Sequence, residues 1–204
     1  SAQQNHLARH SINTMIVGLW IWLQGTGELK RKDLDRMALA LLLHDVGMCK
    51  VPPFLLNKAG PLKQEERDKI IPHPIVGVRL MQKMDVAFEE LLRACFEHHE
   101  RLDGTGYPHG IRGVKLSLPM RIIAVADVFT ALTEDRPYRA GMPLAKAMGI
   151  IESMAELCYL DANVVALLAE YVVLVNRARI RAQRRAAANF VVMRRLCGES
   201  GGAA

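Results

Sequence analysis

The chain has 204 residues, of which 50% are hydrophobic and 24% charged, a composition typical of a soluble globular protein with one substantial core. Its formal net charge is +6, and seven arginines against one glutamate after residue 170 account for all of it. Residues 1–170 are therefore neutral overall, which excludes a body with a globally basic surface for duplex nucleic acid. No apolar run reaches the ~18 residues of a membrane helix. The four cysteines form no Cys-x-x-Cys pair and no secretory signal is present, so we expect a reduced, cytoplasmic chain.

The first part of the chain predicts two helices that carry polar side chains of interest. A helix begins within a few residues of the N-terminus, and His10 lies beside its apolar stripe. This abrupt start predicts a fragment of a longer protein. A second, mostly apolar helix over residues 34–43 ends in His44 and Asp45. A carboxylate at the end of a buried helix needs a partner, and a metal ion would be one.

Three further histidines lie at the ends of predicted helices. Pro72 and Pro74 hold His73 in a stiff setting, although an ordinary loop histidine is the alternative. His98 and His99 end an apolar helix. Neighbouring residues of a helix point about 100° apart, so two adjacent imidazoles fit two neighbouring ions more easily than one. The alternative is a helix C-terminus whose histidines favour the negative end of the macrodipole.

The last third of the chain predicts three helices and completes an all-α pattern without strands. Asp127 lies in an apolar run within the first of them, and an isolated carboxylate there predicts a cationic partner. A polar turn with Arg136 and Arg139 follows, and then a helix over residues 143–157. A final helix from residue 162 becomes arginine-rich after residue 176. It is a solvated extension or linker, or a contact for acidic lipid or RNA.

Five of the seven histidines and two aspartates make up a candidate ligand set. Its members are His10, His44, Asp45, His73, His98, His99 and Asp127. Imidazole and carboxylate ligands without cysteine suit iron, manganese, nickel, cobalt or zinc better than calcium or magnesium. The two doublets favour two ions bridged by Asp45. Ions ~3.5–4 Å apart hold a hydroxide and clamp a phosphoryl oxygen during in-line attack.

These residues carry a resemblance to a known family. His44-Asp45 resembles the HD signature, and residues 98–108, HHERLDGTGYP, resemble the HHExxDGxGYP signature of HD-GYP domains, a branch of the HD phosphohydrolase superfamily. Residues 125–128 and 136–139 are similar to the two segments that follow in that family. The resemblance implies a single HD-type all-α domain over residues 1–170, with a basic helical extension and tail over 171–204.

The resemblance also implies a function and its residues. HD-GYP domains are metal-dependent phosphodiesterases, commonly with iron, that hydrolyse the bacterial second messenger cyclic di-GMP to pGpG or GMP. Position by position, the seven candidate ligands match metal ligands, and Arg136 and Arg139 match residues that hold substrate phosphates. Gly106, Tyr107 and Pro108 match a loop that lines the guanine pocket and contacts partners such as diguanylate cyclases with a GGDEF domain. A missing N-terminal sensory or receiver domain and a homodimer are further expectations.

Three departures from the family pattern leave alternatives open. Met48 stands where the family usually has a lysine, and Lys50, two residues later, is the candidate replacement. The candidate catalytic residues are therefore Asp45, Lys50, Arg136 and Arg139. Thr130 stands where an acidic residue is common. His6 replaces the glutamate of trinuclear members, so a third metal, with His6 as a further ligand, stays open. The alternatives are a weak or inactive module that binds ligands or partners, or a phosphodiesterase for a related nucleotide such as cyclic GMP-AMP.

Overall fold

The computed structural model describes residues 2–27, 30–56, 58–135 and 140–196, and within these ranges it describes side chains from residue 6 to residue 182 and at residue 184. Within these ranges the chain forms helices joined by loops, with an isolated bridge between Asp103 and Arg112 as the sole β-type pairing. The elements in chain order are α1 (Ala2–Thr26), α2 (Arg31–Leu43), η1 (Val46–Lys50), α3 (Pro53–Leu56), α4 (Gln64–Arg67), α5 (His73–Lys83), α6 (Glu89–Glu97), η2 (Gly113–Lys115), α7 (Leu118–Thr133), α8 (Leu144–Glu156) and α9 (Ala162–Leu196). The all-α prediction is confirmed.

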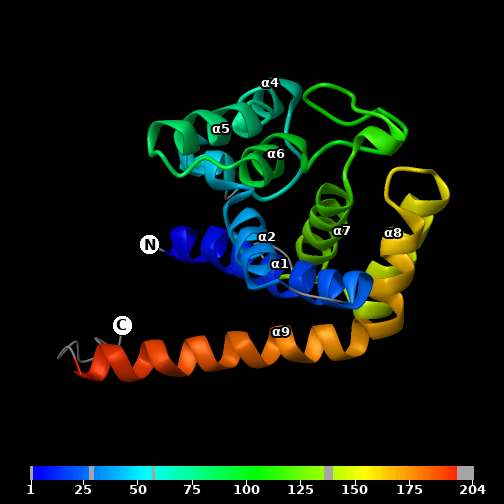
Figure 1. Cartoon of the computed structure of the whole chain (residues 1–204). Coiled ribbons are helices and arrows are strands. Elements are labelled where there is room, and N and C mark those ends of the chain that lie inside the picture. The colour runs from blue at the N-terminus through cyan, green and yellow to red at the C-terminus, as the bar shows by residue number, and fades with distance from the viewer. Residues whose placement is uncertain (1, 28–29, 57, 136–139, 197–204) are drawn as a thin grey trace.

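The main core is built around α7, which lies between α1, α8 and α9 (Figure 1). Ile122, Ile123, Val125 and Phe129 of α7 are fully buried. A helix that is apolar on all sides is stable only where neighbours cover every side, and α7 has such neighbours. Burial of these side chains fixes α7 relative to α1. The polar residues of the two helices are therefore held at constant positions.

A second, smaller cluster joins α5 and α6 to the end of α2. Met81, Leu91 and Cys95 are its buried residues. Beside it η1 packs backbone against backbone on α5, because Gly47 has no side chain to separate them. A Cβ added to Gly47 would lie 2.0 Å from the carbonyl oxygen of His73. This close approach brings the residues just before η1 next to the first turn of α5.

The C-terminal helix α9 runs across the whole molecule beside α1 (Figure 1). Asp161 caps its start, because the carboxylate accepts hydrogen bonds from the backbone N–H groups of Asn163 and Val164, at 2.9 and 3.2 Å. The predicted boundary between residues 170 and 171 falls inside this one helix, and Val175 and Arg179 beyond it are buried. Within the described residues, each helix falls short of the combined length and hydropathy that a bilayer crossing requires.

Candidate metal centre

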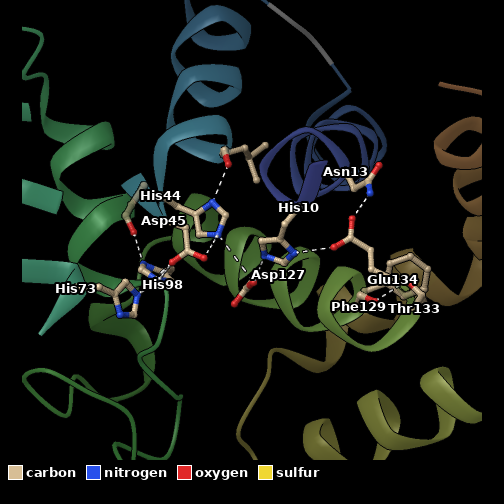
Figure 2. Close-up of polar contacts among 12 residues, drawn as sticks. His10, Asn13, His44, Asp45, His73, His98, Asp127, Phe129, Thr133 and Glu134 are labelled. Carbon is tan, nitrogen blue, oxygen red and sulfur yellow. Dashed lines mark hydrogen bonds and ion pairs between the residues drawn. The ribbon is translucent and has the colours of Figure 1, made fainter. Parts of the chain in front are cut away.

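The seven candidate ligands lie in one cluster, although they come from five separate helices or their ends. Figure 2 shows this cluster without His99. α1 carries His10 and α7 carries Asp127. The other five lie at helix ends, where His44 and Asp45 follow α2, His73 starts α5, and His98 and His99 follow α6. His44 and His98 are fully buried, and His10, His73 and Asp127 are less than 10% exposed.

The ligand atoms form two groups that share one carboxylate. Asp45, His73, His98 and His99 form the first group, and His10, His44 and Asp45 form the second. Within each group the ligand atoms lie within 4.8 Å of one another. Asp127 adjoins the second group, because its Oδ1 is 2.9 Å from Nε2 of His10 and 3.8 Å from Nε2 of His44. This arrangement can hold two cations, with Asp45 between them.

Backbone carbonyls fix three of the imidazoles in the same tautomer. The Nδ1 atoms of His44, His73 and His98 lie 2.7, 2.8 and 2.9 Å from backbone carbonyl oxygens of the preceding turn. A carbonyl oxygen only accepts, so each Nδ1 carries a proton and donates it. In a neutral ring Nε2 is then the acceptor, and all three Nε2 atoms point into the cluster. Metal-ligating histidines are oriented in this way by their other nitrogen.

The acceptor atoms of the first group face one another at short distance. Nε2 of His73 lies 3.1 Å from Nε2 of His98, and Oδ1 of Asp45 lies 3.1 and 3.4 Å from these two atoms. With the ring protons on Nδ1, three lone-pair atoms meet without a hydrogen between them. Nε2 of His44 is buried too and has no hydrogen-bond partner among the described residues. One cation can satisfy the first three atoms and a second cation can satisfy Nε2 of His44, so the residues fit a metal centre.

His10 lies between two carboxylates. Its Nε2 contacts Asp127 at 2.9 Å, and its Nδ1 contacts Oε2 of Glu134 at 3.0 Å. Burial lowers the pKa of His10, but the hydrogen bonds to Asp127 and Glu134 outweigh burial and raise this pKa to about 10. The proton on Nε2 is the one that a metal ion would displace. Glu134 would then keep the proton on Nδ1 and hold the ring in place.

Glu134 is a residue whose role the sequence analysis missed, since it lies in the turn after α7. Its carboxylate is 2% exposed and also accepts a hydrogen bond from the side-chain amide of Asn13. Thr130 lies one turn earlier, and its buried hydroxyl has no hydrogen-bond partner among the described residues. The signal for Glu134 was its spacing from Asp127, because residues seven apart lie on one face of a helix.

The two aspartates of the cluster are ionised. Burial raises the pKa of Asp45, but the close contacts of its carboxylate with the rings of His73 and His98 outweigh burial and hold the pKa well below the usual value. The same balance, with the hydrogen bond to His10 and the nearby ring of His44 opposing burial, holds the pKa of Asp127 well below its usual value. Burial keeps the pKa of His99 well below the ordinary histidine value, so this ring is neutral. Imidazoles beside ionised carboxylates form a donor set for divalent cations, which displace any proton from the ligating nitrogen.

A cavity of about 420 Å³ opens over the cluster. Its polar walls include five of the candidate ligands and His6, and Tyr107 and Met48 also line it. The ring of Tyr107 stacks on His99, with 4.7 Å between ring centroids and 27° between ring planes. A cavity of this size with ligand atoms in its wall is typical of a small-molecule site.

The signature loop after α6 is held by a buried glutamate. Glu100 is 1% exposed and accepts hydrogen bonds from the backbone N–H groups of His109 and Ile111, at 2.7 and 2.9 Å. At Gly106 an added Cβ would lie 2.4 Å from the backbone nitrogen of Arg101, so only glycine fits there. The role of Glu100 was not predicted from the sequence. The loop that carries Tyr107 is therefore fixed by contacts with its own helix end.

The remaining predicted site residues do not belong to the ligand cluster. Lys50 is exposed and is absent from the described residues that line the cavity, whereas Met48 lines it. Gly106 and Pro108 lie in the signature loop beside Tyr107. Arg136 and Arg139 lie outside the described residues, so their predicted contact with phosphates stays a prediction.

Comparison with known proteins gives consistent matches. A family model described as HD domain matches residues 14–164. The 3'3'-cGAMP-specific phosphodiesterase 3 of Vibrio cholerae is 43% identical over 127 residues, which cover 61% of this chain and 27% of that protein. A cyclic di-GMP phosphodiesterase of Pseudomonas aeruginosa is 40% identical over 147 residues, which cover 72% of this chain and 34% of that protein. The chain therefore spans about a third or less of these relatives.

A solved structure shares the fold. The HDG"Y"P protein of Bdellovibrio bacteriovorus aligns with a TM-score of 0.67 and 20% sequence identity, over 81% of this chain and 52% of that one. At this identity the likeness concerns the fold alone.

Proposed function

The chain belongs to the HD domain family and carries the HD-GYP signature, and on this premise we propose that it is a metal-dependent phosphodiesterase for a cyclic dinucleotide. Cyclic di-GMP, hydrolysed to pGpG or GMP in bacterial second-messenger signalling, is the first candidate substrate. One observation carries the proposal. The Nε2 atoms of His73 and His98 and the carboxylate of Asp45 converge without a proton between them in a cluster that borders a cavity of about 420 Å³.

We assign two divalent transition-metal ions to the cluster, with iron as the first candidate and manganese, nickel, cobalt or zinc as alternatives. The ligands would be the three histidines His73, His98 and His99 on one side, His10, His44 and Asp127 on the other, and Asp45 in both sets. When bound, such ions activate water and stabilise the charge on a phosphoryl oxygen. His6 also lines the cavity and is the candidate ligand for a third ion.

The chain's own residues would bind and orient the nucleotide. Tyr107 offers an aromatic ring to a base, already fixed by its stacking on His99. Arg136 and Arg139 are the proposed phosphate ligands, because the planar guanidinium fork matches two phosphate oxygens. The loop with Gly106 and Pro108 would border the base and contact a diguanylate cyclase partner. A sensory or receiver domain before residue 1 and a homodimer belong to the same proposal.

Two observations favour related functions. The Vibrio cholerae relative is named for 3'3'-cGAMP, which makes cyclic GMP-AMP the second candidate substrate. Met48 lies in the cavity wall, at the position where HD-GYP domains usually have a lysine. The loss of this cation favours a weak or inactive module that acts by binding.

An anaerobic assay tests the proposal. Protein reconstituted with iron or manganese is incubated with cyclic di-GMP, cyclic GMP-AMP and pGpG, and products are separated by chromatography. Turnover should disappear in the double variant His44→Ala with Asp45→Ala. It should persist when two exposed acids at the start of α2 are removed, in Asp33→Ala with Asp35→Ala. Fully metal-loaded wild type without turnover of any of the three nucleotides, or an active His44/Asp45 double variant, would refute the proposed function.

A further inference from the structure

The cavity contains one permanent cation among its described lining residues. Carboxylates, imidazoles and apolar side chains make up nearly all of the wall, and Lys58 is the sole lysine or arginine within it. A cyclic dinucleotide carries two phosphodiester anions. If the proposed function holds, on which this inference rests, a substrate of this class meets Lys58 and the metal centre in the same cavity.

The position of Lys58 follows from the chain around it. Leu55 and Leu56 of α3, Gly60 and Leu62 also line the cavity, so the described residues on the two sides of position 57 contribute much of one wall. Lys50 belongs to η1, lies before this segment and is exposed. Two lysines close in sequence thus differ in direction, and only the later one belongs to the described cavity wall.

Glu66 fixes the ammonium group of Lys58. Its Oε2 lies 2.5 Å from Nζ of Lys58 and also accepts a hydrogen bond of 2.7 Å from the backbone N–H of Lys63, at the start of α4. The side chains of Lys58 and Glu66 are 29% and 22% exposed, so the pair is partly shielded from water. An ammonium has three N–H donors, and Glu66 accepts one of them. Donors of Lys58 therefore stay available for an anion in the cavity.

We infer that Lys58 is a substrate-positioning residue, held by Glu66, that donates a hydrogen bond to a phosphate oxygen of the bound cyclic dinucleotide. It provides the cation that Met48 cannot supply and that Lys50, outside the described wall, does not supply. A point charge on a flexible stem suits a phosphate oxygen, and a charge-assisted hydrogen bond of this kind is stronger than a neutral one.

The test compares Lys58→Met, Lys58→Arg and a control, Lys83→Met, which removes an exposed lysine at the end of α5. Each protein is reconstituted with manganese and assayed for metal content, unfolding temperature, kcat and KM with cyclic di-GMP and cyclic GMP-AMP. Lys58→Met should raise KM, and the Kd of a fluorescent cyclic di-GMP, about 10-fold or more, since a hydrogen bond to a charged group is lost. Lys58→Arg should recover most of this loss, and Lys83→Met should match wild type.

Several results would overturn the inference. Unchanged KM and Kd in Lys58→Met would do so directly. A loss that follows metal content or unfolding temperature, without recovery in Lys58→Arg, would make Lys58–Glu66 a structural ion pair only. Failure of the proposed function is a separate outcome, because wild type without turnover still reports nucleotide binding through Kd. In that case a weaker Kd in Lys58→Met alone still supports the inference for a binding module.

Discussion

Replacement of Gly47 by alanine tests whether η1 and α5 pack backbone against backbone beside the metal centre. An ideal Cβ at Gly47 would lie 2.0 Å from the carbonyl oxygen of His73 and 2.7 Å from the backbone nitrogen of Gly77. Ordinary contacts of a Cβ begin near 3.4 Å. Both neighbours are backbone atoms of α5, so no side chain can rotate out of the way. The first turn of α5 must move by roughly 1 Å, and His73 moves with it.

The expected cost follows from this overlap. Overpacking of a close contact costs about 1–3 kcal/mol, and for a chain of this size each kcal/mol lowers the unfolding temperature by about 2–4 °C. Gly47→Ala should therefore lower the unfolding temperature of the metal-free protein by about 2–12 °C. The matched control is Gly149→Ala in α8, where an added Cβ has no atom within 4 Å. It should raise stability by about 0.5–1 kcal/mol, because glycine weakens a helix.

The assay is thermal unfolding of both variants in EDTA, followed by metal titration. Gly47→Ala should also bind manganese more weakly than wild type. Nε2 of His73 lies 3.1 Å from Oδ1 of Asp45 and 3.1 Å from Nε2 of His98, so a shift of His73 disturbs the first ligand group. Gly149→Ala should bind it as wild type does. If Gly47→Ala unfolds at or above the wild-type temperature with unchanged manganese affinity, η1 and α5 do not pack backbone against backbone as described.

Two further predictions concern other parts of the structure. Glu134→Gln should lower metal affinity by about 10- to 100-fold, because the carboxylate that orients His10 is lost. Competition with a chelator measures this change, and Asp135→Asn, at an exposed neighbour, is its control. Burial raises the pKa of the Cys95 thiol to about 12, so almost no thiolate is present at pH 8. Iodoacetamide at pH 8 should therefore label exposed Cys49 and spare Cys95 until the protein is unfolded, which mass spectrometry reports; native labelling of Cys95 at the rate of Cys49 would contradict its burial.

The sequence allowed prediction of the helical fold and of the candidate ligands because both depend on local patterns. Apolar runs that end in His44-Asp45 and in His98-His99 predict helix ends. Polar side chains at the ends of buried helices need polar or cationic partners, whichever helices pack around them. Asp127 could be selected because an isolated carboxylate in an apolar helix is costly. These arguments need no knowledge of which helices touch.

Other features of the site could not be predicted, because they depend on side-chain rotamers or on how the helices pack. The carbonyls that hold Nδ1 of His44, His73 and His98 belong to the turns before them, and their role appears only when the rings are placed. Glu134 lies two helical turns after Asp127, but its contact with His10 also depends on how α1 packs on α7. Spacing alone could nominate Glu134 and could not supply its partner.

For the two lysines after Met48, position in the sequence does not predict which side chain faces the cavity. Lys50 is nearer in sequence to the HD doublet, and proximity made it the candidate for a catalytic cation. η1 is a short 3-10 helix pressed against α5 by Gly47, and this packing leaves Lys50 at the surface. The chain then passes through α3 before Lys58, which lines the cavity and forms an ion pair with Glu66. A lysine eight residues farther along the chain is thus the one that lines the cavity, because the fold between the two lysines, and not their distance from the HD doublet, decides which of them borders it.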